Sequence, residues 1–210
     1  MKHHYLNSAL GALLCGLSLY AFADGETHAR LDMKYDASVR EVPVESVGNL
    51  CTIRIAPTTD ARQNRETIGS SIHGALLVGE LGTWATDGLN NLREFGAKVE
   101  PADGDNPPAN GILIKSSLTR AYTWQIGLKL FSMVALKVEY YNSNGLLEEK
   151  YYRAHGDKTN MWSAESEYLT TMNYGINNML PVIAQDLTSL CAGKLVEKYT
   201  YAGPTEAKKP

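Results

Sequence analysis

The sequence predicts one small α/β domain of the α+β type, with a mainly antiparallel sheet and two main helices packed on one face. Segments with alternating apolar residues occupy the middle of the chain, and stretches with helical spacing stand before and after them. The 210 residues suffice for one domain with a substantial core, and apolar residues make up 44% of them, as in ordinary globular proteins.

The amino terminus has the pattern of a secretory signal peptide. Lys2 precedes an apolar run over residues 10–22, which ends in Ala21-Phe22-Ala23 before a polar stretch. A basic start, a short apolar segment and small residues before a polar break are typical of signal peptides cleaved after Ala23. The run is shorter than the roughly 20 residues of a membrane-spanning helix, so removal of residues 1–23 is preferred over an uncleaved anchor.

A second cleavage site competes with the first. Ala12-Leu13-Leu14-Cys15 resembles the lipobox of bacterial lipoproteins, in which the cysteine becomes the acylated first residue. Leu14 stands where a lipobox usually has a small residue, so cleavage after Ala23 is preferred. Lipidation of Cys15 would attach the protein to the outer membrane, whereas cleavage after Ala23 would leave it soluble in the periplasm.

Removal of residues 1–23 leaves two cysteines, Cys51 and Cys191. In an oxidising compartment they can pair, and the bond would close a loop of nearly the whole domain. In the chain-entropy model, such a loop closure stabilises the folded state by roughly 3 to 5 kcal/mol. Two buried free thiols are the alternative. Neither cysteine belongs to a Cys-x-x-Cys motif, so redox catalysis has no support.

The mature chain divides into a polar lead-in at residues 24–49, a domain at residues 50–193 and a partly disordered C-terminal extension at residues 194–210. Residues 51–55 alternate and are rich in β-branched side chains, which predicts a strand that Pro57 ends. Residues 58–71 are polar and rich in turn formers, which predicts a loop.

The first helix is predicted after Gly79, with Gly96 at the expected position of its C-cap. Its apolar residues recur at steps of three and four: Leu81, Trp84, Ala85, Leu89, Leu92 and Phe95.

The middle of the chain predicts a β-meander. Apolar and polar residues alternate from Ile112 to Thr119 and again from Leu128 to Glu139. Asn142-Ser143-Asn144-Gly145 predicts a hairpin turn, followed by a returning strand over residues 146–153. So short a connection implies antiparallel pairing.

A continuous apolar stripe from Leu169 to Leu190 predicts the second helix, with a kink or break before Pro181. If this helix packs on the sheet, Cys191 can meet Cys51 at one sheet edge.

The sequence contains no catalytic, metal-ligand or nucleotide motif, so no cofactor and no metal are expected. His28, His73 and His155 lack the spacing of a zinc site. Residues 69–74 place serine near histidine without the Gly-x-Ser-x-Gly elbow, although a triad can be assembled from distant residues. The net charge of −3 offers no basic surface for nucleic acid.

Two tyrosine pairs stand on strands expected to be neighbours: Tyr140-Tyr141 and Tyr151-Tyr152. They could form an aromatic binding face for a glycan or peptide. Aromatic cross-strand pairs are also an ordinary way to stabilise a sheet, and that interpretation is preferred.

The order of these elements over residues 50–191 resembles small envelope lipoproteins of the YajG kind and the auxiliary lipoproteins of envelope ABC transporters in Gram-negative bacteria. The residues that carry the resemblance are Asp60-x-Arg62 after a strand, Gly69, and Glu94-Phe95-Gly96-Ala97-Lys98-Val99 at a helix end. The resemblance implies a non-enzymatic domain at the periplasmic face of the outer membrane, acting through protein or lipid contacts.

The expected function is therefore that of a non-enzymatic periplasmic accessory or assembly protein of the cell envelope, with envelope proteins as partners. A small-ligand or glycan-binding module using the four tyrosines is the alternative. A hydrolase, which would need His73 or His155 beside a carboxylate and a nucleophile, is least favoured.

Overall fold

The computed structural model describes residues 29–40, 43–47, 50–71, 74–100, 104–160 and 165–196. The expected signal peptide, Cys15, His28, His73 and most of the C-terminal extension lie outside these residues. Within the described ranges, no helix is long and apolar enough to cross a membrane.

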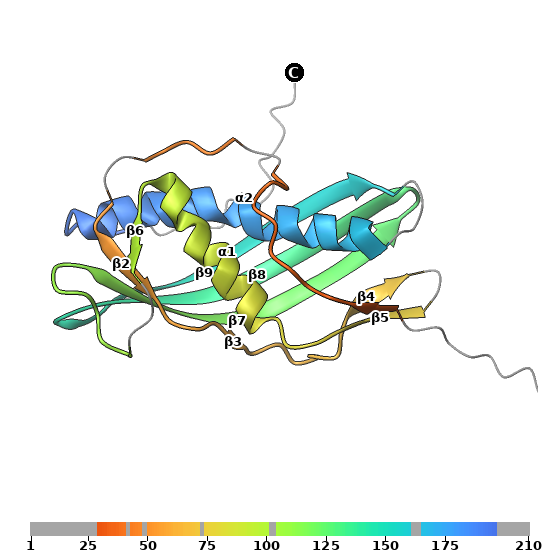
Figure 1. Ribbon diagram of the computed structural model, residues 1–210, viewed down its shortest axis with the longest axis horizontal. Helices are drawn as coiled ribbons and strands as arrows, with labels where there is room; N and C mark the ends of the chain where they lie inside the picture. Colours follow the sequence, from red (N-terminus) through yellow and green to blue (C-terminus); the bar gives the residue numbers. More distant parts are fainter. Residues whose placement is uncertain are drawn as a thin grey trace, which may run out of the picture.

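The structure confirms the α+β class, and Figure 1 shows the arrangement of its elements. In chain order they are β1 (Ala29–Leu31), β2 (Thr52–Ile55), β3 (Thr59–Asp60), β4 (Thr67–Ser71), β5 (Gly74–Val78), α1 (Gly82–Asn90), the 3-10 helix η1 (Asn91–Phe95), β6 (Lys98–Glu100), β7 (Ile112–Ile126), β8 (Lys129–Asn142), β9 (Gly145–Thr159) and α2 (Glu165–Cys191).

The long strands β7, β8 and β9 form the expected antiparallel meander. The short strands β2 and β3 pair with β7 in parallel, and β6 pairs with β2, so the main sheet of the described residues is mixed. A second, three-stranded sheet has the order β1-β5-β4. The loop expected over residues 58–71 thus contains β3, which pairs with the distant strand β7, and β4, which forms a hairpin with the adjacent strand β5. These pairings outweigh the local turn-forming composition.

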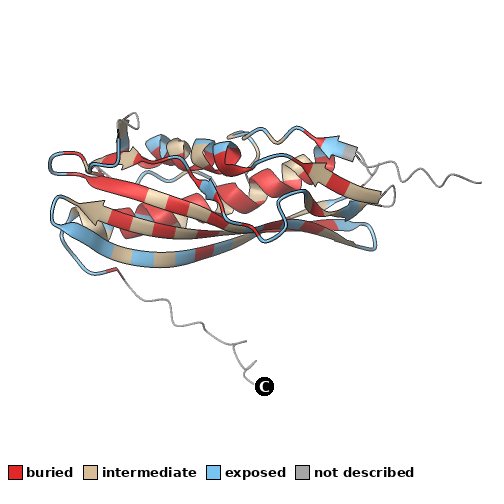
Figure 2. Cartoon of the chain, turned by 90° about the horizontal axis from the view of Figure 1, so that it is seen from below, coloured by how far each residue is buried: buried red, intermediate tan, exposed pale blue. Residues whose placement is uncertain are grey.

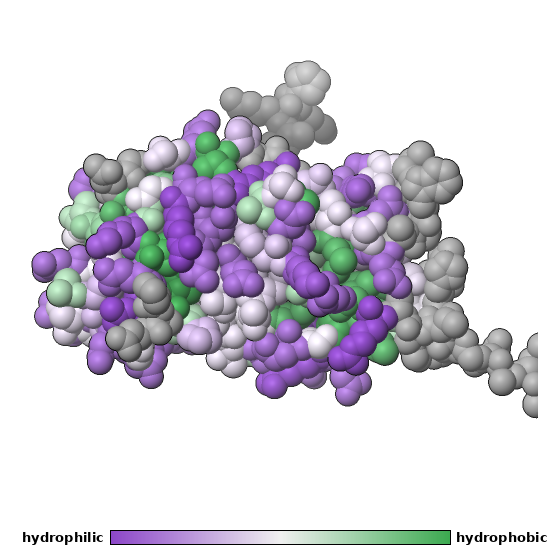
Figure 3. All heavy atoms as spheres, viewed as in Figure 1, coloured by the Kyte–Doolittle hydropathy of each residue, from purple (hydrophilic) through white to green (hydrophobic). Residues whose placement is uncertain are grey.

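The two helices lie on the same side of the main sheet, since α2 packs on β8 and β9 and also contacts α1. Buried residues, red in Figure 2, gather where the helices face the strands. The surface seen in Figure 3 is mostly hydrophilic, with apolar residues in separate small areas. The core contains the predicted helical stripes and alternate strand residues, among them Leu89, Leu92, Val134, Leu136, Met172, Ile176, Leu180 and Leu187.

The first helical stretch ends as expected at Gly96, which has a φ of 100° in the left-handed region that glycine tolerates. The second helix, α2, is one continuous element of 27 residues with Pro181 inside it. Of the kink or break expected near residues 177–179, the break is therefore absent from α2. A proline removes one backbone donor, and the burial of Met179, Leu180 and Ile183 holds the helix to the sheet on both sides of that position.

Residues 32–40 of the lead-in pack against α2 through two asparagines spaced one helical turn apart. The Asn173 amide nitrogen donates to the carbonyl of Lys34 at 3.1 Å, and its oxygen accepts from the Asp36 N–H at 3.1 Å. The Asn177 amide nitrogen donates to the Asp36 carbonyl at 3.0 Å, and its oxygen accepts from the Tyr35 hydroxyl at 2.6 Å. Paired in this way, the buried polar groups of α2 fix the path of the lead-in.

Small residues allow α2 to approach the sheet closely. The Ser132 hydroxyl of β8 donates to the Thr171 carbonyl of α2 at 2.6 Å. A Cβ added at Gly156 of β9 would lie 2.4 Å from the Thr171 oxygen and 2.5 Å from Cβ of Tyr174.

Gly156→Ala is therefore expected to push α2 away from β9 and to lower the free energy of unfolding by about 1–3 kcal/mol. Urea denaturation followed by circular dichroism measures this loss. Gly79→Ala is the matched control, because the nearest atom to an added Cβ there is 4.0 Å away. Equal stability of the two variants would contradict the close-approach argument.

Candidate functional site

The side of β7, β8 and β9 that faces away from both helices is the candidate functional surface, here called the open face. Strand residues alternate between the two sides of a sheet, so every second residue belongs to it. Its residues are Lys115, Ser117, Arg120, Tyr122 and Trp124 of β7, Lys129, Phe131, Met133, Ala135, Lys137, Glu139 and Tyr141 of β8, and Glu149, Tyr151, Arg153, His155 and Asp157 of β9.

A β-bulge decides which residues of β7 reach the open face. Leu118 is paired with Leu136 and Arg120 with Ala135, so Thr119 is the extra residue. Odd-numbered residues face outward before the bulge, and even-numbered residues face outward after it. Tyr122 and Trp124 therefore reach the open face, whereas Ala121 and Thr123 are buried.

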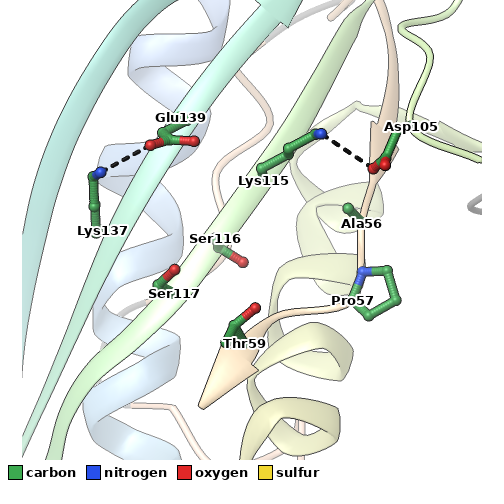
Figure 4. Close-up of a pocket in the computed structure, with 9 residues that line it drawn as sticks. All are labelled: Ala56, Pro57, Thr59, Asp105, Lys115, Ser116, Ser117, Lys137 and Glu139. Atoms are coloured by element: carbon green, nitrogen blue, oxygen red, sulfur yellow. Dashed lines mark hydrogen bonds and ion pairs between the residues drawn. The ribbon is translucent and has the colours of Figure 1, made fainter. Parts of the chain in front are cut away.

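The beginning of this surface contains a charged pocket of about 310 Å³ (Figure 4). The Lys115 ammonium lies 3.1 Å from a carboxylate oxygen of Asp105. The Lys137 ammonium lies 2.8 Å from Glu139 and 3.0 Å from Glu149. The pocket is lined by Ala56, Pro57, Thr59, Asp105, Lys115, Ser116, Ser117, Lys137 and Glu139.

The charges of this pocket neutralise one another. The hydrogen bond from Lys137 is the main reason why the pKa of Glu139 is lowered, and the Tyr141 hydroxyl adds a hydrogen bond at 3.0 Å. The hydrogen bonds to Glu139 and Glu149 in turn raise the pKa of Lys137. Both groups are therefore held in their charged forms at neutral pH, which does not suit either of them to proton transfer.

The far end of the open face has an aromatic cluster of Tyr122, Trp124, Phe131 and His155. The Trp124 ring lies 5.3 Å from that of Tyr122 and is stacked on that of Phe131 at 5.5 Å. The His155 ring meets Trp124 edge-on at 6.3 Å. These rings stand on three neighbouring strands and remain in part exposed, with Tyr122 at 39%. The cluster therefore offers a partner several aromatic rings at once.

A second cavity, of about 530 Å³, adjoins the aromatic cluster at Tyr122. It lies between residues 61–69 and residues 119–122 of β7, further along the strand than the charged pocket. Gln63 and Arg120 bring an amide and a guanidinium to its wall. This cavity combines polar groups with the edge of an aromatic surface, as small-molecule sites commonly do.

The four tyrosines expected to share one binding face do not do so. Tyr140 and Tyr152 are 0% and 4% exposed and face α2, whereas Tyr141 and Tyr151 are on the open face. The physical reason is that consecutive strand residues point to opposite sides of the sheet. A binding face made of all four residues is therefore excluded.

The buried tyrosines belong to a polar network that joins β8 and β9 to α2. The hydroxyls of Tyr140 and Tyr152 are 2.6 Å apart, and Tyr152 also donates to Asp186 at 2.5 Å. The Lys150 ammonium lies 2.7 Å from the same carboxylate. Burial, followed by the neighbouring Tyr140 and the hydrogen bond to Asp186, raises the pKa of Tyr152. This network holds α2 on the sheet.

The structure contains a disulfide between Cys51 and Cys191, with the two Cα atoms 5.4 Å apart. The Cys51 N–H also donates to the Cys191 sulfur at 3.1 Å. The bond connects the residue before β2 to the last residue of α2, so the two cysteines pair as expected. The contact is not at a sheet edge, because β2 lies between β6 and β7.

The remaining candidates for chemistry are dispersed. His155 has an aromatic neighbour in Trp124, and the Asp157 carboxylate two residues further along is paired with Lys129 at 2.8 Å. Within the described part of the chain, histidine, cysteine, aspartate and glutamate form no group of three or more that could hold a metal ion.

The sequence reasoning missed the aromatic cluster and the arginines beside it. The available signal was the alternation Arg120-x-Tyr122-x-Trp124, which continues the strand beyond Thr119. It was hidden because the bulge breaks the alternation at that residue.

No protein-family model matches the sequence, and no curated protein matches it. Among solved structures, the chain is similar to a Xanthomonas campestris protein of the DUF330 family, with a TM-score of 0.49 and 8% identity over 79% of this chain and 94% of that one. A minor lipoprotein from Acinetobacter baumannii matches with a TM-score of 0.42 and 10% identity over 75% of this chain and 100% of that one. The PelC dodecamer from Paraburkholderia phytofirmans matches with a TM-score of 0.35 and 15% identity over 66% of this chain and 92% of that one. The proteins that this chain resembles in structure thus include a lipoprotein and PelC.

Proposed function

We propose that this chain is an exported, non-enzymatic accessory protein of the bacterial cell envelope that binds another envelope protein through its open face. The observation that carries the proposal is the partly exposed aromatic cluster of Tyr122, Trp124, Phe131 and His155. The exposed Arg120 lies beside it in the sheet. Aromatic residues and arginine are among the types enriched at the centres of protein interfaces.

Export is supported by the signal-peptide pattern of residues 1–23 and by a disulfide that an oxidising compartment would maintain. Cleavage after Ala23 would leave the protein soluble in the periplasm, whereas acylation of Cys15 would attach it to the outer membrane. Both forms would present the open face to partners in the same compartment.

A non-enzymatic role is supported by the way the buried ionisable groups are used. Asp60 is paired with Arg62 at 2.7 Å, and Asp186 is paired with Lys150 at 2.7 Å. Both pairs connect separate segments of the fold, because Asp60 also accepts from the Leu81 N–H and Asp186 from Tyr152. These buried ion pairs therefore serve to stabilise the fold.

A small-ligand or glycan-binding role is the second candidate function. The 530 Å³ cavity beside Tyr122 favours it, because residues with an amide, a guanidinium and an aromatic ring line that cavity. The surface for this role is thus the cavity and the aromatic cluster instead of the four tyrosines first considered.

A photo-reactive aromatic amino acid placed at Tyr122 or Tyr151 is expected to yield the same discrete protein adduct when cells of the native host are illuminated. The same group placed at Gln185, which is exposed on α2, is expected to yield none. With the probe at Tyr151, Trp124→Ala is expected to lower the adduct yield about tenfold or more, since truncated interface aromatics commonly cost 2 kcal/mol or more of binding free energy.

Leu146→Ala is the matched control, because Leu146 is 54% exposed at the opposite end of the meander. Adducts from Gln185 alone would contradict the assignment of the open face. Adducts with a glycan in place of a protein would favour the second candidate function.

A further inference from the structure

Two arginines flank a single alanine on the open face. The register pairs Ala135 of β8 with Arg120 of β7 on one side and with Arg153 of β9 on the other. Neighbouring strands are about 4.8 Å apart, so the two arginine backbones are separated by about 10 Å. Both arginines are exposed, and only a methyl group stands between them. The two guanidinium groups can therefore meet over Ala135 on one ligand.

The charges of these arginines contrast with those of the lysines on the same surface. Lys115, Lys129 and Lys137 each have a carboxylate within 3.1 Å. Among the described residues, no hydrogen-bond or ion-pair partner is found for Arg120 or Arg153. The fold neutralises the lysines internally and leaves the arginine charges available to a ligand.

The rows of the sheet on either side of the arginine pair add no negative charge. One neighbouring row of the sheet contains Tyr122, Met133 and His155, and the other contains Ser117, Lys137 and Tyr151. Neither row contains an acidic residue. The nearest rows with carboxylates hold Glu139, Glu149 and Asp157. Glu139 and Glu149 are both paired with Lys137, and Asp157 is paired with Lys129. An anion bound over Ala135 would thus meet positive charge with aromatic rings on either side.

We propose that Arg120 and Arg153 bind acidic side chains of the partner protein that docks on the open face, an inference that rests on the proposed function. Guanidinium groups bind carboxylates through two parallel N–H···O bonds, which fixes the orientation of the ligand as well as its charge. The aromatic cluster beside the pair would hold apolar residues of the same partner segment.

The test uses the mature full-length protein and two probes, a hexaglutamate peptide and a hexaglutamine peptide, with binding followed by the amide NMR signals of β7, β8 and β9. Saturable shifts around Ala135 are expected with hexaglutamate and not with hexaglutamine. The affinity should fall as salt rises from about 0.05 M to about 0.3 M, because screening weakens exposed charge pairs. The double variant Arg120→Gln/Arg153→Gln should bind about tenfold or more weakly, with an unchanged spectrum elsewhere.

The matched control is Arg93→Gln/Lys194→Gln, which removes the same charge from two exposed residues in η1 and after α2, away from the open face. Its affinity should stay within about twofold of wild type. An equal loss of hexaglutamate affinity in both double variants would overturn the proposal, because binding would then depend only on the net charge of the protein. Tighter binding of an oligomeric uronic acid than of hexaglutamate would also overturn it, by assigning the arginines to an acidic carbohydrate.

The native cross-linking experiment separates this inference from the proposed function. If the adduct from Tyr151 requires Trp124 but persists in Arg120→Gln/Arg153→Gln, the open face binds a protein without using the arginine pair. That result overturns the acidic-partner inference alone. Absence of any protein adduct from the open face would overturn the proposed function itself.

Discussion

Reduction of the Cys51–Cys191 disulfide is expected to lower the free energy of unfolding by about 3 to 5 kcal/mol. The two cysteines are separated by 140 residues, so the bond closes a loop that spans nearly the whole described domain. In the chain-entropy model, such a loop restricts the unfolded chain far more than the folded one. Urea denaturation with and without a reducing agent measures the difference.

The double variant Cys51→Ala/Cys191→Ala separates loss of the bond from other effects of the reductant. Its stability should match that of the reduced protein to within about 1 kcal/mol, and adding reductant should not change it further. If thiol labelling showed complete reduction of the wild type with no change in its urea midpoint, the entropic account of this bond would be wrong.

Asp60→Ala is the second change with a large expected effect, a loss of about 3–5 kcal/mol in the free energy of unfolding. The Asp60 and Arg62 side chains are 1% and 3% exposed, and the guanidinium donates to both carboxylate oxygens, at 2.9 and 2.7 Å. Removing the carboxylate leaves a buried guanidinium without its counter-charge. Thermal or urea unfolding measures the loss.

Two further variants define the mechanism of that loss. Asp60→Ala/Arg62→Met should recover part of the stability, because the uncompensated charge is gone. Asp157→Ala breaks the ion pair with Lys129, in which the lysine side chain is 57% exposed and the aspartate side chain 44% exposed. This change should lower the free energy of unfolding by less than about 1 kcal/mol. Equal losses in Asp60→Ala and Asp157→Ala would show that burial of the first pair is not the cause.

The same carboxylate should make stability depend on pH. Burial alone would raise the pKa of Asp60, but hydrogen bonds from Arg62 and from the Leu81 N–H outweigh it and lower the pKa below its ordinary value. The stabilisation is therefore present above the unfolded pKa of about 3.9 and is lost as pH falls through the lower native value. Wild type should lose more stability than Asp60→Ala on acidification below about pH 4.

Tyr140 and Tyr152 show why the predicted four-tyrosine binding face was wrong although the strands that carry it were predicted correctly. Strand alternation already separates Tyr140 from Tyr141 and Tyr151 from Tyr152, because consecutive residues point to opposite sides. The sequence does not say which side a helix covers. The structure places α2 over Tyr140 and Tyr152 and buries them, so two of the four candidate residues became core.

The amino-acid sequence alone determined those elements that depend on residues close together in the chain. The helical stripes, the left-handed Gly96 and the Asn142–Gly145 turn are properties of neighbouring residues, and each stands in the structure as expected. The α+β class followed from their order. The pairing of Cys51 with Cys191 could be anticipated as well, since only two cysteines follow residue 23.

Tertiary structure alone decided the candidate site. The short strand β3 pairs with the distant strand β7, and β4 pairs with the adjacent, more apolar strand β5, so the polar sequences of β3 and β4 by themselves resemble a loop. The bulge at Thr119 turns Arg120, Tyr122 and Trp124 to the open face, where strict alternation from Lys115 would have buried them. Which face of a strand is exposed to solvent depends on the pairing register and on where the helices pack. Both are set by contacts between distant residues.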